Sequence, residues 1–285
     1  MRPRRAYSHR SIQSNGGIQL NARKIVITSG KGGVGKTTTT VNLGAALAKA
    51  GKRVILVDAD IGLRNLDLVL GLEKRIVFDL VEVAEGRCQL RQALIRDKRF
   101  PALFLLPAAQ TRDKEAVNEE QFAAIVDQAS RTADYVLIDC PAGIEGGFRN
   151  AVAGAAEAIV VTTPEVSAIR DADRVVGKLD ERGMPMRLIV NRLRPEMVHS
   201  GDMLSVDDVC EVLAIELLGI VPDDEEIIDT TNRGEPIVLD GGNKLGAVYH
   251  KIARRLEGEI VPFTTFNNGL RQGLFGRLFA GLKAG

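Results

Sequence analysis

A run of glycines, lysines and threonines near the amino end of the chain has the spacing of a phosphate-binding loop. Residues 30–38 read GKGGVGKTT, which fits the pattern G-x-x-x-x-G-K-[ST]. Glycines permit tight turns whose N–H groups converge on anionic oxygens, and a following helix N-terminus adds positive dipole. Lys36 is expected to contact the β- and γ-phosphates, and the Thr37 hydroxyl to ligate Mg²⁺. The expected nucleotide contacts are Gly30, Lys31, Gly32, Gly33, Val34, Gly35, Lys36, Thr37 and Thr38.

Carboxylates follow two further apolar segments. Asp139 ends the apolar run 135–138, as in the Walker B pattern, and is expected to hold Mg²⁺ through a coordinated water. Asp58 and Asp60 follow the apolar run 53–57. Such an acid pair can simply cap a turn, but behind a phosphate loop it is also placed to order a water molecule or the magnesium shell. The expected magnesium ligands are Thr37, Asp60 and Asp139.

These motifs require a framework of strands alternating with helices. Strands are expected at residues 25–28, 53–57, 103–106, 135–138, 158–162, 187–190 and 217–221. Helical patterns fall at residues 41–50, 119–130, 168–181, 206–214 and 246–257. The alternation predicts an α/β P-loop NTPase fold, a mostly parallel twisted sheet with helices on both faces. Because ligands in such sheets bind beyond the carboxyl ends of the strands, the polar motifs are expected to share one site.

Composition limits the possible classes of protein. The 285 residues are 45% hydrophobic with a formal charge of +1, which suits a globular α/β core and gives no overall bias toward nucleic acid. Three cysteines lie far apart, so neither a zinc site nor a disulfide framework is expected. No acid precedes Asp58, which leaves the phosphate-binding end electropositive.

A second lysine, Lys31, follows the first glycine of the loop. The resulting KGGVGKTT string resembles the deviant Walker A ATPases of the ParA/MinD family, which include partitioning ATPases, the nitrogenase iron protein, flagellar-number regulators and division-site proteins. In that family this lysine typically reaches across a dimer to the partner's nucleotide. The resemblance therefore implies that Lys31 acts in trans and that ATP holds two subunits together. Taken alone, Lys31 could equally be a solvated surface lysine.

The resemblance also assigns roles in three later loops. In the family, the acid at the position of Asp60 positions the hydrolytic water, so Lys31, Lys36 and Asp60 are the expected catalytic residues, with Asp58 in support. Gly143 is expected to turn its N–H toward the γ-phosphate. The loops expected to flank the adenine carry Asn191, Arg192, Pro222 and Asp223, although such pairs also occur in ordinary turns. The guanine-specific N-K-x-D motif is not evident, which favours ATP over GTP.

Longer motifs resemble the division-site branch of the family. They are GLRNLDLVLG at 62–71, DCPAGIE at 139–145 and RDADRV at 170–175. This resemblance implies a homodimer with ATP, a MinC-like division inhibitor and a MinE-like activator as partners, and no nucleic acid. A flagellar-number-type regulator, a DNA-partitioning ATPase and a non-hydrolysing scaffold are the alternatives.

The carboxyl-terminal segment 263–285 has the pattern of an amphipathic helix. Apolar residues recur at helical spacing, at Leu270, Leu274, Phe275, Leu278, Phe279 and Leu282. Such a segment can order at a lipid interface or dock on the body of the protein, and its terminal position and basic residues favour the membrane. Residues 23–262 are expected to form the ATPase domain, preceded by a disordered basic leader at 1–22. We therefore expect a cytoplasmic protein that is peripheral on the inner face of the cell membrane, with a plastid stroma as the alternative.

Overall fold

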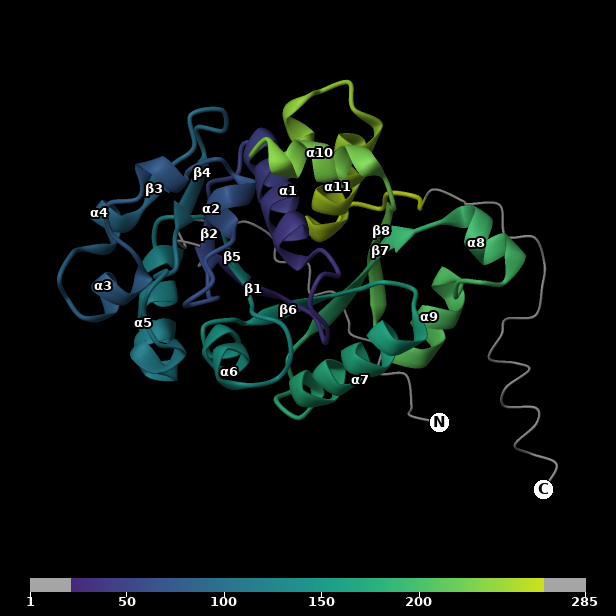
Figure 1. The fold of residues 1–285 in the computed structure, drawn as a ribbon, viewed down its shortest axis with the longest axis horizontal. Helices are drawn as coiled ribbons and strands as arrows, with labels where there is room; N and C mark the ends of the chain where they lie inside the picture. The colour runs from purple at the N-terminus through teal and green to yellow at the C-terminus, as the bar shows by residue number, and fades with distance from the viewer. Residues whose placement is uncertain (1–21, 264–285) are drawn as a thin grey trace, which may run out of the picture.

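A computed structural model describes residues 22–263 and contains one eight-stranded sheet within them (Figure 1). The strand order is β3-β4-β2-β5-β1-β6-β7-β8, and every pairing is parallel except that of β3 with β4. The strands are β1 (Arg23–Thr28), β2 (Val54–Asp58), β3 (Ile95–Arg96), β4 (Leu103–Leu106), β5 (Tyr135–Asp139), β6 (Glu157–Thr162), β7 (Met186–Leu193) and β8 (Glu216–Pro222). The predicted fold class and all seven predicted strands are confirmed.

Helices cover both faces of this sheet (Figure 1). The α-helices are α1 (Lys36–Lys49), α2 (Leu66–Val69), α3 (Leu80–Ala84), α4 (Leu90–Ala93), α5 (Glu119–Ser130), α6 (Gly146–Ala153), α7 (Val166–Asp180), α8 (Pro195–Ser200), α9 (Val206–Leu213), α10 (Glu225–Asn232) and α11 (Lys244–Leu256). Short 3-10 turns are η1 (Glu73–Arg75), η2 (Lys114–Ala116) and η3 (Ile237–Leu239). Helices α1, α2, α10 and α11 pack on one side, and α5, α6, α7 and α9 on the other.

The sheet separates two apolar cores, one on each of its faces. In β1, Ile25 and Ile27 belong to the core under α1 and α11, whereas Val26 belongs to the opposite core. Successive strand residues point to opposite faces, and both faces of this sheet are covered. The continuous apolar runs in the sequence follow from this double burial.

The carboxyl ends of the parallel strands meet along one edge of the sheet. In the register of β2 with β5, Asp58 lies opposite Asp139, and in that of β1 with β5, Ile27 lies opposite Asp139. Helix α1 begins at Lys36, earlier than residue 41 where the apolar pattern starts, because the whole phosphate-loop sequence turns directly into the helix. The edge thus gathers the loops that carry the predicted site.

The predicted leader and tail extend beyond the described part of the chain. Residues 1–21 and 264–285, including the apolar positions from Leu270 to Leu282, lie outside the described residues. Within residues 22–263, no helix is long and apolar enough to cross a bilayer.

Candidate nucleotide-binding site

The loop between β1 and α1 has the backbone conformation that its glycines predict. Gly33 and Gly35 adopt positive φ values of 77° and 93°, which side-chain-bearing residues rarely tolerate. Gly30 packs so tightly on α7 that a Cβ there would lie 2.1 Å from the carbonyl carbon of Asp171. The Ser29 hydroxyl donates a hydrogen bond to the carbonyl oxygen of Lys31 at 2.8 Å. The loop is therefore preformed and held on both sides.

Lys31 lies at the exposed outer side of this loop. Its Nζ atom is 3.3 Å from the Ser167 hydroxyl at the start of α7, and no carboxylate lies within 4 Å of it in the described part of the chain. Gly32 and Gly33 beside it are exposed and have open space at their Cα atoms. Among the described residues no ion pair therefore occupies this ammonium group, which is exposed to a ligand that approaches from outside the subunit.

Asn191, near the end of β7, contacts the phosphate loop through its side chain. Its side-chain amide donates a hydrogen bond to the carbonyl oxygen of Val34 at 2.7 Å. Since that oxygen can only accept, the Asn191 Oδ1 atom points the other way. A Cβ on Gly35 would lie 2.2 Å from the same amide nitrogen, so the contact requires glycine there. The structure thus places Asn191 against the phosphate loop, with its acceptor oxygen left for another donor.

Two threonine hydroxyls hold the carboxylate of Asp139. Thr37 donates to Oδ2 at 2.7 Å, and Thr40, one turn later in α1, donates to Oδ1 at 3.0 Å. Burial raises the pKa of Asp139 to about 6, against the opposing effects of the two hydroxyls and of the Lys36 ammonium. Lys36 itself is buried, with 9% of its surface exposed. The predicted residues Lys36, Thr37 and Asp139 are therefore brought together.

This group fits a hydrated magnesium ion. No cluster of three or more His, Cys, Asp or Glu residues able to hold a metal occurs within residues 22–263. Mg²⁺ at phosphate sites needs only one or two protein ligands, because phosphate oxygens and waters complete its shell. The Thr37 hydroxyl and the Asp139 carboxylate are the groups that would hold it, and the ion would neutralise charge on the phosphates.

Asp58 shapes the segment that follows β2. Its fully buried carboxylate accepts hydrogen bonds from the backbone N–H groups of Asp60 at 3.0 Å, Asn65 at 3.0 Å and Leu66 at 3.1 Å. Burial, followed by the nearby charge of Asp139, raises the pKa of Asp58 to about 7. Asp60 remains half-buried at the mouth of the site. Asp58 therefore stabilises the conformation of the loop, and Asp60 is the acid of the pair that is partly exposed to solvent.

The loop after β5 touches the phosphate loop directly. The Gly143 N–H donates to the carbonyl oxygen of Ser29 at 3.2 Å, and Gly143 has a positive φ of 91°. Burial raises the pKa of the Cys140 thiol to about 12. That cysteine is therefore a packing residue and carries no reactive thiolate.

The last two predicted loops lie at the ends of β7 and β8. Arg192 is exposed, with a positive φ of 55°. Asp223 forms an ion pair of 2.5 Å with Arg194, so its carboxylate is held beside β7, and Pro222 ends β8 half-buried. The structure thus places Asn191 against the phosphate loop and pairs Asp223 with Arg194.

Three contributors were not predicted from the sequence. Thr40 supports Asp139, Ser29 links two loops, and Arg194 holds Asp223. The run of four threonines at 37–40 carried a signal for Thr40, since residues three or four apart share a helix face.

Comparisons with known proteins agree with this geometry. The model of the CobQ/CobB/MinD/ParA nucleotide binding domain matches residues 25–237. The septum site-determining protein MinD of Synechocystis is 59% identical over 246 residues, covering 86% of this chain and 92% of the relative. MinD of Bacillus subtilis is also 59% identical, over 84% of this chain and 90% of its own length. The chain belongs to the MinD family of septum site-determining ATPases.

Solved MinD structures share the fold described above. The MinC:MinD cell division protein complex of Aquifex aeolicus matches with a TM-score of 0.80 and 51% identity, covering 86% of this chain and 99% of that one. MinD of Pyrococcus horikoshii, complexed with Mg-ADP, matches with a TM-score of 0.76 and 31% identity over 83% of this chain and 96% of that one. As a MinD-family P-loop ATPase, the protein uses ATP and Mg²⁺.

Proposed function

We propose that this protein is a division-site ATPase that dimerises around ATP, attaches to the membrane through its tail, and is released when ATP is hydrolysed. In the dimer it recruits a MinC-like inhibitor, and a MinE-like partner stimulates hydrolysis. It acts from the cytoplasm as a peripheral protein on the inner face of the cell membrane. The observation that carries the proposal is that Lys31 is exposed at the mouth of the site, with no carboxylate within 4 Å among the described residues.

Exposed apolar side chains at the same end of the sheet as that lysine, which we call the apolar rim, support dimerisation. Leu63, Ile144 and Val166 follow the carboxyl ends of β2, β5 and β6, and are 61%, 41% and 57% exposed. Exposed apolar side chains gathered around a polar site are typical of surfaces that pack against a partner. A second copy covering this edge would bury the rim and bring its own Lys31 to the nucleotide of the first subunit.

Within the site, we assign separate tasks to the gathered side chains. Lys36 binds the phosphates, Asp60 orients the hydrolytic water, and Thr37 with Asp139 holds the metal. The buried carboxylate of Asp139 must be deprotonated to do so. Asn191, Arg192, Pro222 and Asp223 form the surroundings of the base, and Gly143 senses the γ-phosphate.

The tail couples the nucleotide to lipid through simple energetics. Burying one Leu or Phe contributes about 1.5–3 kcal/mol, and a Lys or Arg near the lipid about 1 kcal/mol. Ordering the tail costs about 1–2 kcal/mol per residue, so a single copy binds weakly. Two tails on one dimer can raise the avidity by about 10²–10⁴ without any new contact. Dimerisation thereby becomes the membrane switch.

A MinC-like partner is supported by the Aquifex aeolicus relative, which was solved as a MinC:MinD complex. The high identity to septum site-determining relatives favours this function over a flagellar-number regulator or a DNA-partitioning ATPase.

Light scattering and vesicle sedimentation test the proposal. With Mg²⁺ and a non-hydrolysable ATP analogue, the full chain is expected to form a dimer and to sediment with anionic vesicles, whereas with ADP it stays monomeric and soluble. Lys31→Ala should abolish both effects, and Lys98→Ala, at an exposed lysine of the β3–β4 turn, should abolish neither. A chain that stays monomeric when saturated with the analogue would contradict the proposal.

A further inference from the structure

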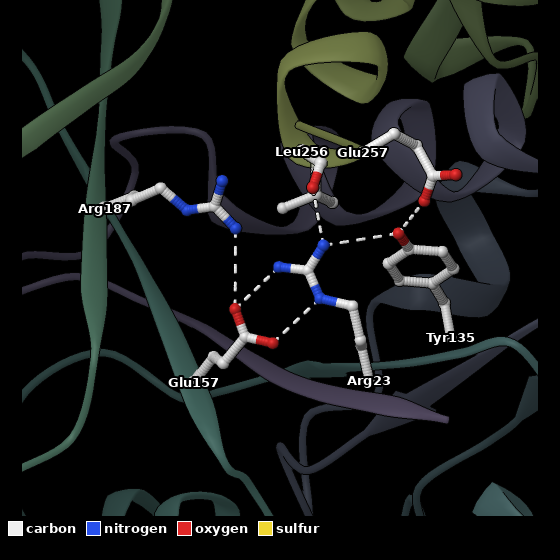
Figure 2. A network of polar contacts seen from close by, with 6 residues as sticks. All are labelled: Arg23, Tyr135, Glu157, Arg187, Leu256 and Glu257. Atoms are coloured by element: carbon white, nitrogen blue, oxygen red, sulfur yellow. Dashed lines mark hydrogen bonds and ion pairs between the residues drawn. The ribbon is translucent and has the colours of Figure 1, made fainter. Parts of the chain in front are cut away.

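The carboxyl end of α11, from which the tail departs, is fixed to the sheet by a polar network (Figure 2). Arg23, at the start of β1, binds both carboxylate oxygens of Glu157, at 2.8 and 2.6 Å. Its third nitrogen donates to the carbonyl oxygen of Leu256, the last residue of α11, at 2.5 Å. The Tyr135 hydroxyl hydrogen-bonds the carboxylate of Glu257, the next residue. The end of α11 is thus bonded to β1 and β5, and Arg23 connects it to Glu157 at the start of β6.

The chain beyond α11 turns back along that helix, and we call residues 259–263 the tail root. Arg255 holds the tail root, because its guanidinium donates to the carbonyl oxygens of Val261 and Pro262, at 2.8 Å each. The same group donates to Leu218 of β8 at 3.3 Å and lies 4.0 Å from the centroid of the Phe263 ring. The tail root is therefore a fixed part of the body.

Apolar side chains project from this fixed segment. Ile260 is 100% exposed, although nothing in a polar turn requires an isoleucine. Phe263 is 39% exposed and shares a small pocket with Ile220, Val248 and Lys251. Ile260 and Phe263 lie three residues apart, so this one short segment offers two apolar side chains, one fully and one partly exposed, to a partner.

The exposed face of α11 beside them is basic. Helix α11, KLGAVYHKIARRL, contains no acidic residue. Lys244 and Lys251 are exposed and, seven residues apart, lie on the same helix face. Neither has a carboxylate within 4 Å among the residues that the structure describes, whereas Arg254 is neutralised by Glu259 at 2.7 Å. Lys251 thus lies beside Phe263 of the tail root, and Lys244 lies about two turns farther away along the same face of α11.

We propose that the tail root and the exposed face of α11 form a second lipid contact, on the body of the protein, with an anionic bilayer surface as the partner. Ile260 and Phe263 enter the interface between headgroups and acyl chains, while Lys244 and Lys251 contact the anionic headgroups. The inference rests on the membrane attachment proposed above and adds a rigid contact to it. The occupant is a membrane because the patch is apolar and basic and continues directly into the amphipathic segment 264–285.

A fixed contact has a physical effect that a flexible tail lacks. Because Arg23 holds the end of α11 and Arg255 holds the tail root, contact of the tail root with lipid sets the orientation of the whole body on the bilayer. Little backbone entropy is lost there on binding, since the segment is already ordered.

The absence of tryptophan from the chain makes a direct experiment possible. Ile260→Trp places a single fluorophore at the tail root of the full-length protein, and Val77→Trp places one at a 75% exposed position outside it. With Mg²⁺, ATP analogue and phosphatidylglycerol–phosphatidylcholine vesicles, the emission of the Ile260→Trp variant is expected to shift to shorter wavelength and to be quenched by brominated acyl chains. The Val77→Trp control should show neither effect.

The outcomes separate the two proposals. Sedimentation with vesicles, together with an unshifted and unquenched emission from the Ile260→Trp variant, would overturn the second contact and leave attachment by the tail intact. Failure to sediment would overturn both. As an independent measure, Lys244→Glu with Lys251→Glu should weaken binding to anionic vesicles about tenfold. The matched pair Lys74→Glu with Lys98→Glu, also at exposed lysines, should leave it unchanged, and equal losses in the two pairs would contradict the proposed headgroup contact.

Discussion

Asn191 and Val34 lie 157 positions apart in the sequence, yet the amide of one is 2.7 Å from the carbonyl oxygen of the other. This bond joins the end of β7 to the centre of the phosphate loop. Gly35, next to Val34, is the position that allows it, because any Cβ there would meet the amide nitrogen. The end of β7 and the phosphate loop are thereby parts of one rigid unit.

The first prediction concerns Gly35. Gly35→Ala introduces both a strained positive φ and a clash with Asn191, and strain of this kind costs about 1–3 kcal/mol. The melting temperature of the nucleotide-free protein should fall by about 3–10 °C. Gly32→Ala is the matched control, since a Cβ there meets nothing within 4 Å. Equal shifts in the two variants, measured by calorimetry, would contradict the interlock with Asn191.

The second prediction concerns Thr40 as a positioning residue for the metal. Thr40→Val keeps the shape of the side chain but removes the bond to Asp139, so the apparent affinity for Mg²⁺ in ATP hydrolysis should fall about tenfold. Thr40 also donates a hydrogen bond to the carbonyl oxygen of Lys36, four residues earlier in its helix, and Thr230 in α10 makes the equivalent bond to Glu226. Thr230→Val is therefore the control, since it removes the same kind of helix contact far along the chain from Asp139. Magnesium titrations of both variants check it, and an unchanged midpoint for Thr40→Val would refute the assigned role.

The third prediction is a pH dependence of folding stability. Burial alone would raise the pKa of Glu157, but the hydrogen bond and charge of Arg23, with help from Arg187, lower it below its ordinary value of 4.5. Since the folded pKa lies below the unfolded one, the stabilisation is complete above pH 4.5 and is lost as the pH falls through the folded pKa. Glu157→Gln should cost about 1–3 kcal/mol at neutral pH and less in acid.

Urea unfolding at neutral and acidic pH measures this difference. Glu181→Gln provides the comparison, because its ion pair with Lys178 lies on the surface and contributes little at any pH. If Glu157→Gln and the wild type lost stability equally on acidification, the network of Figure 2 would not be the source of the effect.

The fourth prediction concerns Arg99, which joins three segments on the α1 side of the sheet. Its guanidinium binds the buried carboxylate of Asp97 at 2.7 Å and the carbonyl oxygens of Leu70 at 2.6 Å and Gly234 at 2.8 Å. Arg99→Ala leaves all three acceptors without this donor, and should destabilise the protein by about 2–3 kcal/mol in urea unfolding. Arg91→Ala, at an exposed arginine bonded to Gln89, should change stability by much less. A small effect at position 99 would show that solvent replaces the lost donors.

The sequence predicted the parts of the fold that double burial makes conspicuous. Strands β1, β2, β5 and β6 are continuous apolar runs because helices cover both faces of the sheet. Their carboxyl ends had to meet, so the gathering of Lys36, Thr37 and Asp139 followed from the order of the motifs. The catalytic roles assigned to Lys31 and Asp60 stay predictions.

Other features of the fold could not be predicted from the spacing of residues. Strand β3 is two residues long and antiparallel, too short for any period to show. Helix α10 has only eight residues and was not predicted. Bonds such as that between Asn191 and Val34 depend on distant segments meeting in space, which a single sequence does not reveal.

The three backbone N–H groups that donate to Asp58 have a consequence for how the nucleotide binds. The backbone of the segment from Asp60 to Leu66 has already lost most of its conformational entropy before any ligand binds. A ligand that binds at this end of the sheet therefore meets a preorganised segment, and any movement of that segment on binding is the shift of an ordered loop.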